Sequence, residues 1–156
     1  KVLIKGNHCT WWTSRSKVEA VLHPSITLLQ NDAVQIGDGE DAVVVVGARL
    51  WDPPDAPWAE GNAAKIFNRE LERLRLSIAA GAKLEARTRI ALIHYPPRYS
   101  DGRVIEAAGV SICIYGHLHG DGHKYGFQGE AGGIRYHLTA CDAIDFRPIE
   151  VELPRD

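Results

Sequence analysis

Residues 112–120 read "ICIYGHLHG", a short apolar run that ends in two histidines set between glycines. The run is strand-sized and apolar, which predicts a β-strand. In an extended chain, the rings of His117 and His119 would point in opposite directions. Gly116 and Gly120 permit a turn that brings both rings to one site; otherwise each ring serves a different ion of an adjacent pair.

Two other strand-like stretches end in the same manner. Residues 2–4 lead into Gly6-Asn7-His8, and residues 90–93 lead into His94 and "YPP". In an open α/β sheet, ligands bind at the carboxyl ends of the strands. We therefore expect these three loops to converge, although they lie far apart in the sequence.

The wider pattern predicts an α/β layered domain, because strand-like and helix-like stretches alternate. The length of 156 residues suits one domain, 1–156, with a core of its own. Strands are expected at residues 2–4, 42–46, 90–93, 112–115 and 134–138, and helices at 62–80 and 103–108.

The helix expected at 62–80 has one apolar stripe, formed by Phe67, Leu71, Leu74 and Ile78. Its charged residues, Glu70 among them, are assigned to the solvent face. A shorter first helix is expected after Thr13 or Ser14, with Val18, Val21 and Leu22 on its inner face.

Composition excludes several classes of partner. A net charge of −2 leaves no basic excess for a nucleic acid backbone, and no apolar run has the length of a membrane span. The three cysteines show no C-x-x-C spacing, which favours a reducing, cytoplasmic location. Cys113, inside an apolar run, is expected in the core.

The residue types at the three strand ends suit a metal. Neutral imidazoles bind Mn, Fe and Zn, and an Asn carbonyl adds a harder oxygen ligand. A single histidine at a strand end is more often structural. Three such stretches in one chain are difficult to explain by packing, so a metal site is the better interpretation.

The motifs "GNH", "HYPP" and "GHLHG", with "YHLTACDAIDF" near the end, resemble the calcineurin-like metallophosphoesterases. The similarity is greatest to a bacterial predicted-phosphohydrolase subgroup and extends from Lys1 to about Pro148. The resemblance implies an α/β/β/α layered sandwich with a site for two divalent metal ions (Mn, Fe or Zn). It also implies that the substrate is a phosphate ester, which the protein hydrolyses. Such ions bind phosphate oxygens and lower the pKa of a bridging water.

The resemblance also implies roles for individual residues. Asn7, His94 and His117 would bind the second ion, and His119 the first. His8 would be catalytic, lying over the phosphate and either donating a proton to the leaving group or stabilising developing charge.

The chain departs from the family pattern in two ways. The family has Asp-x-His and Gly-Asp motifs upstream of Gly-Asn-His, and only five residues precede Gly6 here. We therefore expect an N-terminally truncated fold, lacking the first βα portion, with weak activity or none. Asp38 copies the letters of a Gly-Asp motif, but its position favours a hairpin turn.

Cys9 is the second departure, because the family has Asp or Glu after Gly-Asn-His. A thiol is a poor partner for orienting His8. Cys9 and His123 are kept as possible accessory residues of the site.

Two hypotheses follow: a metal-dependent phosphohydrolase domain, or a non-catalytic module that binds metal or self-associates. A fold without its first portion would expose apolar surface or a sheet edge, so we expect a homo-oligomer.

Overall fold

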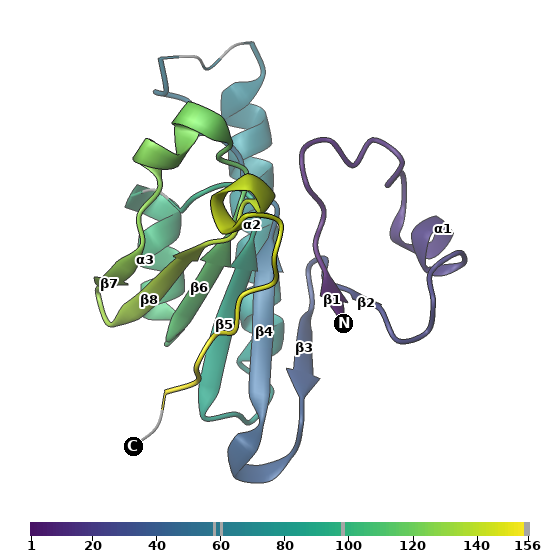
Figure 1. The fold of residues 1–156 in the computed structure, drawn as a ribbon. Coiled ribbons are helices and arrows are strands. Elements are labelled where there is room, and N and C mark those ends of the chain that lie inside the picture. The colour runs from purple at the N-terminus through teal and green to yellow at the C-terminus, as the bar shows by residue number, and fades with distance from the viewer. Residues whose placement is uncertain (58, 60, 98, 155–156) are drawn as a thin grey trace.

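The computed structural model describes residues 1–57, 59, 61–97 and 99–154, and it has the predicted mixed α/β class (Figure 1). The strands are β1 (Val2–Leu3), β2 (Thr27–Leu28), β3 (Ala33–Ile36), β4 (Val43–Ala48), β5 (Thr88–Ile93), β6 (Ile112–Tyr115), β7 (Gly129–Ala131) and β8 (Ile134–Leu138). The helices are α1 (Arg15–Glu19), α2 (Ala63–Gly81) and α3 (Tyr99–Ala107), with 3₁₀ turns η1 (Gly39–Asp41), η2 (Gly120–Tyr125) and η3 (Cys141–Ile144).

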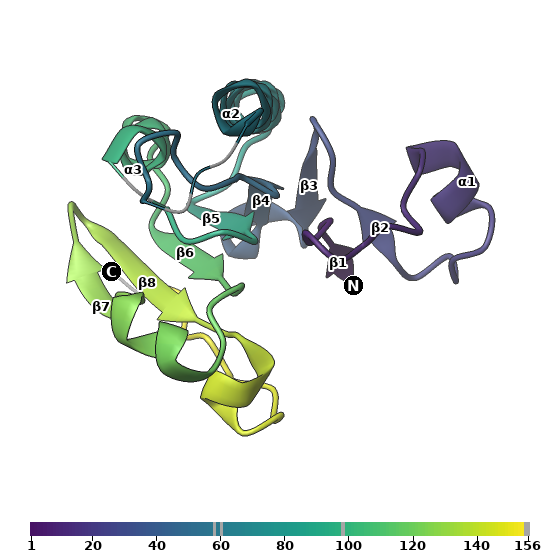
Figure 2. The same cartoon turned by 90° about the horizontal axis from the view of Figure 1, so that it is seen from above.

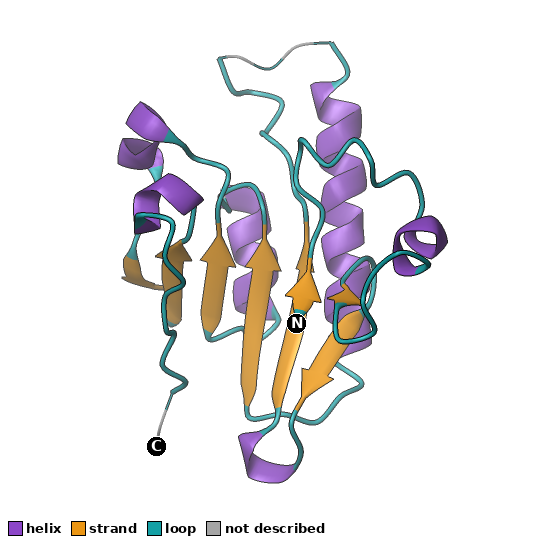
Figure 3. Cartoon of the chain, turned by 45° about the vertical axis from the view of Figure 1, so that its right-hand side comes forward, coloured by secondary structure: helices purple, strands orange, loops and turns teal. Residues whose placement is uncertain are grey.

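Six strands form one mixed sheet in the order β3-β4-β5-β6-β8-β7. The four inner strands are parallel, and β3 and β7 pair antiparallel at the two edges. The carboxyl ends of the inner strands therefore share one edge of the sheet, at the top in Figure 3. A separate parallel pair, β1-β2, lies beside this sheet.

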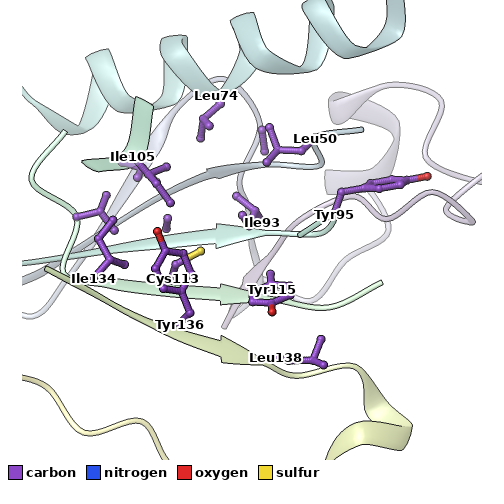
Figure 4. Close-up of a cluster of buried hydrophobic side chains, with 14 of the residues drawn as sticks. Leu50, Leu74, Ile93, Tyr95, Ile105, Cys113, Tyr115, Ile134, Tyr136 and Leu138 are labelled. Carbon is purple, nitrogen blue, oxygen red and sulfur yellow. The ribbon is translucent and has the colours of Figure 1, made fainter. Parts of the chain in front are cut away.

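The main core lies between the sheet and helices α2 and α3, which cover the same face (Figure 2). Leu74 of α2 and Ile105 of α3 are fully buried against strand residues such as Cys113, which is in the core as predicted (Figure 4). Burying a leucine of this kind stabilises the fold by about 2 kcal/mol.

Helix α2 confirms the predicted apolar stripe. Phe67, Leu71 and Leu74 are buried, and Ile78 packs partly against the core. Gly81 is the last helical residue, and its lack of a side chain permits close packing: a Cβ there would lie 2.5 Å from a methyl of Val46.

Helix α1 is shorter than expected. Ser14 caps it by accepting a hydrogen bond from the Lys17 amide, and Val18 is buried as predicted. The prediction for Val21 was wrong: its side chain is 81% exposed, because the helix ends at Glu19 and the chain turns away from the core.

The face of the sheet opposite α2 and α3 is partly covered. Leu29, Val43 and Val45 are buried there, and Val34 packs beside them. The β3–β4 hairpin closes through η1, so the turn predicted at Asp38 is confirmed. Within the described residues, no helix combines the length and apolar character needed to span a membrane.

Candidate metal centre

Backbone hydrogen bonds join the ends of the parallel strands and continue the pairing past each one. The Tyr95 amide donates to the Arg49 carbonyl after β4 and β5, and the Gly116 amide donates to the His94 carbonyl after β5 and β6. Thr139 donates to Tyr115 in the same way after β6 and β8. The loops that carry the candidate ligands are thus held side by side.

Three of the predicted ligands converge at this edge. His94 Nε2 lies 2.7 Å from Asn7 Oδ1 and 3.3 Å from His117 Nδ1. Gly6 allows the Gly-Asn-His loop to approach this closely, since a Cβ at Gly6 would lie 3.3 Å from His94 Cε1. The convergence expected from the strand ends is present.

No placement of protons on His94 Nε2 and His117 Nδ1 gives all three of these atoms a hydrogen-bond partner. Asn7 Oδ1 only accepts, so a proton on His94 Nε2 points to Asn7 and not to His117. If His117 Nδ1 carries the proton, it donates to an unprotonated His94 Nε2. The lone pair of His94 Nε2 would then also face the Asn7 oxygen, and these two acceptors would repel each other. A cation among these atoms would satisfy all three, and adjacent ligands of a metal with bonds of about 2.1 Å lie about 3 Å apart.

Burial keeps both imidazoles neutral. The pKa of His94 falls to about 4, first because of its burial and then because His117 and Arg49 lie near it. The pKa of His117 is also lowered by burial, although the nearby carboxylate of Asp52 opposes this shift. Neutral imidazole is the form that binds metals, so both rings are ready to act as ligands.

The backbone at His117 is strained. This residue has φ +70°, in the left-handed region that non-glycine residues adopt rarely. The expected turn therefore forms at His117 and Gly120 (φ +53°), while Gly116 is not left-handed. The ring of His117 stacks on Tyr95, with centroids 3.8 Å apart, and this contact helps to fix its direction.

His8 and Cys9 occupy different environments. His8 is exposed, and its charge lowers the pKa of both His94 and His117, which places it beside the centre. The Sγ of Cys9 accepts a hydrogen bond from the Gly6 amide at 3.3 Å. Cys9 thus supports the turn that presents Asn7.

His119 contacts a carboxylate that the sequence did not suggest. Its Nδ1 lies 2.7 Å from Asp142 Oδ1, and the other oxygen of Asp142 accepts from the Gly120 amide at 2.8 Å. His123 Nε2 also approaches Asp142 Oδ1, at 3.2 Å. The Gly120 amide, and then the two histidines, hold the pKa of Asp142 well below its usual range.

Asp142 could have been predicted from the expectation that ligands follow the carboxyl ends of parallel strands, because Asp142 follows β8, which is parallel to β6, at the same edge of the sheet. Asp52 follows β4 in the same way, and its charge reaches His117. Both were missed because the prediction used asparagine and histidine close to the strand ends, whereas each of these carboxylates comes four residues after its strand.

A buried ion cluster adjoins the centre. Glu70, assigned from sequence to the solvent face, is 1% exposed, so that prediction was wrong. Its Oε1 pairs with Arg49, Arg69 and Arg73 at 2.9–3.1 Å. Arg49 also lies 4.6 Å above the ring of Trp51, so the cluster connects helix α2 to the loop after β4.

No protein-family model, no curated protein and no solved structure matched the chain. The assignment of the centre therefore depends on its own geometry.

Proposed function

We propose that this chain is a divalent-metal-binding domain of the phosphohydrolase type, related to the calcineurin-like metallophosphoesterases and weakly active or inactive as it stands. The observation that carries the proposal is the convergence of Asn7 Oδ1, His94 Nε2 and His117 Nδ1, from loops up to 110 residues apart. One amide oxygen and two neutral imidazoles fit a single Mn²⁺, Fe²⁺ or Zn²⁺ ion.

Each residue has a part in this proposal. Asn7, His94 and His117 hold one ion, and His119 is the expected ligand of the other. Bound ions would polarise a phosphate ester and lower the pKa of water. His8 is exposed beside the ligands, where it can give a proton to a leaving oxygen or stabilise its charge.

The expectation of weak activity has a physical reason. Neutral ligands offset the charge of two dications poorly, and carboxylates normally do so. The carboxylates that the structure brings near the histidines, Asp52 and Asp142, come from loops that the resemblance does not assign to metal.

The finer fold expectation, an incomplete α/β/β/α sandwich, is part of the same proposal. Two observations support it: α2 and α3 cover one face of the six-stranded sheet, and the opposite face carries a second apolar cluster. The exposed side chain of Ile36 on the edge strand β3 favours the alternative function, a self-associating module without catalysis.

The test is metal content and turnover of bis-(p-nitrophenyl) phosphate with added Mn²⁺. We expect bound Mn²⁺ in the unaltered chain, a loss of Mn²⁺ binding in His117→Ala, and no loss in His23→Ala, a surface histidine. Slow turnover that disappears in His117→Ala would support a phosphohydrolase activity. Metal binding without turnover would support an inactive metal-binding domain. A chain that binds no Mn²⁺, Fe²⁺ or Zn²⁺ would refute the proposal.

A further inference from the structure

A second cluster of metal-ligand side chains lies where the loops after β6 and β8 meet. The ligand atoms of His119, Cys141 and Asp142 all lie within 4.8 Å of one another. His123 adds a fourth donor, with Nε2 3.2 Å from Asp142 Oδ1. His119 directly precedes the 3₁₀ turn η2, His123 lies in η2, and Cys141 and Asp142 lie in η3, so the cluster is built from two short, adjacent segments.

The fold alone satisfies the Nε2 nitrogen of His123 poorly. His123 Nε2 is buried, and among the described residues it has no hydrogen-bond partner, despite its closeness to Asp142. A buried polar atom without a partner costs about 1–3 kcal/mol. An ion in front of this nitrogen would remove that cost.

Asp142 is oriented as metal-binding carboxylates are. The Gly120 amide holds Oδ2, so Oδ1 is turned to the two imidazoles. Outer hydrogen bonds of this kind fix the direction of a ligand and strengthen binding. An ion pair between Asp142 and a protonated His119 would account for their 2.7 Å contact, but not for His123 or for the nearby thiol of Cys141.

The donor set selects one class of ion. Two imidazoles, one carboxylate and one thiol suit Zn²⁺, which takes four such ligands in a tetrahedron. Bonds of about 2.0–2.3 Å place those donors about 3–4 Å apart, so small side-chain movements would complete the geometry.

We propose that His119, His123, Cys141 and Asp142 form a site for one Zn²⁺-type cation, separate from the centre of Asn7, His94 and His117. The inference depends on the proposed function only in that His119 is expected to bind a second ion. Zinc binding here needs no hydrolytic activity.

The experiment is a titration of the chelator-treated full chain with Co²⁺, followed by competition with Zn²⁺. Cobalt bound to a thiolate gives a near-ultraviolet charge-transfer band and visible bands of tetrahedral intensity. We expect these bands in the unaltered chain and in His117→Ala, which removes a ligand of the other centre. Zn²⁺ should displace the cobalt and remove the bands.

Two variants and two matched controls assign the ligands. Cys141→Ser should lose the charge-transfer band, and Asp142→Asn should bind Zn²⁺ about 100-fold more weakly. Cys9→Ser, a thiol outside the cluster, should keep the charge-transfer band, and Asp121→Asn, an exposed carboxylate in η2, should bind Zn²⁺ as tightly as the unaltered chain does. Circular dichroism confirms that each variant is folded.

The two proposals fail in different ways. Bands that persist in Cys141→Ser, or Zn²⁺ affinity unchanged in both Cys141→Ser and Asp142→Asn, would overturn the zinc site and leave the other centre untouched. Bands that vanish in His117→Ala would also overturn it, because the cluster would then not be a separate site. Mn²⁺ binding lost in His117→Ala with the cobalt bands retained would support both proposals.

Discussion

Asn7 Oδ1 and His94 Nε2 lie 2.7 Å apart although 87 residues separate them in the sequence. One follows β1 of the small sheet and the other follows β5 of the large sheet, so this contact joins the two sheets at the edge that carries the candidate centre. The contact also defines the charge of the centre, because both groups are neutral at pH 7.

The neutrality of that pair leads to the first prediction. Asn7→Asp keeps the shape of the side chain and adds a negative charge where the amide oxygen lies. We expect Mn²⁺ to bind about tenfold more tightly, because hard cations prefer carboxylate ligands. Isothermal titration calorimetry measures the change.

Asn68→Asp, on the exposed side of α2, adds the same charge to the chain and should leave Mn²⁺ affinity unchanged. Equal affinities for Asn7→Asp and the unaltered chain would show that Asn7 is not a ligand.

The second prediction concerns pH. Because the pKa of His94 is lowered to about 4 in the fold from an ordinary 6.5, the unfolded chain binds more protons between these values. The stabilisation is complete above pH 6.5 and is lost as pH falls toward 4. Allowing for partial exposure, we expect the metal-free chain to lose about 1–2 kcal/mol between about pH 7 and pH 5.

Urea unfolding at the two pH values provides the measurement. His94→Gln should show a smaller loss than the unaltered chain, whereas His23→Gln should show the full loss, since His94 is intact. An equal loss in all three proteins would mean that His94 does not carry this pH dependence.

The sequence predicted the secondary structure best where a buried element appears as a continuous apolar run. The strands at 112–115 and 134–138 were predicted to the residue, since both are short runs closed by glycine or a loop. The edge strands β3 and β7 were missed. Polar residues such as Gln35 and Glu130 interrupt their apolar pattern, so no continuous apolar run marks them.

The residues of the candidate site also fall into those that the sequence predicted and those that it did not. Histidines at strand ends identified Asn7, His94 and His117, whereas Asp142 needed the pairing of β8 beside β6. Glu70 was misassigned by its charge, although its spacing of three from Phe67 and four from Leu74 places it on the buried face. Its Arg49 partner lies 21 residues away in the sequence, and no local pattern predicts that contact.

Glu70 is the subject of the third prediction. Glu70→Gln removes a buried charge that pairs with Arg49, Arg69 and Arg73. We expect a loss of about 3–5 kcal/mol in the free energy of unfolding, because partly buried guanidinium groups are left without a counter-charge. Chemical denaturation measures it.

The same helix provides the control. Glu72 is 60% exposed and pairs with Arg75 at 3.5 Å, so Glu72→Gln should change stability by no more than about 0.5 kcal/mol. Similar effects of the two substitutions would contradict the structural role given to Glu70.

The last prediction is self-association. Strand β3 is an edge of the six-stranded sheet, and the apolar side chain of its last residue, Ile36, is 51% exposed. A second copy that pairs with this edge would bury Ile36 twice, once in each chain. Ile36→Lys should therefore weaken a dimer about 100-fold, as followed by light scattering over a range of concentrations. Val21→Lys, at an 81% exposed position after α1, should leave the dimer unchanged. If the unaltered chain stays monomeric at every concentration, the hypothesis of a self-associating module is excluded.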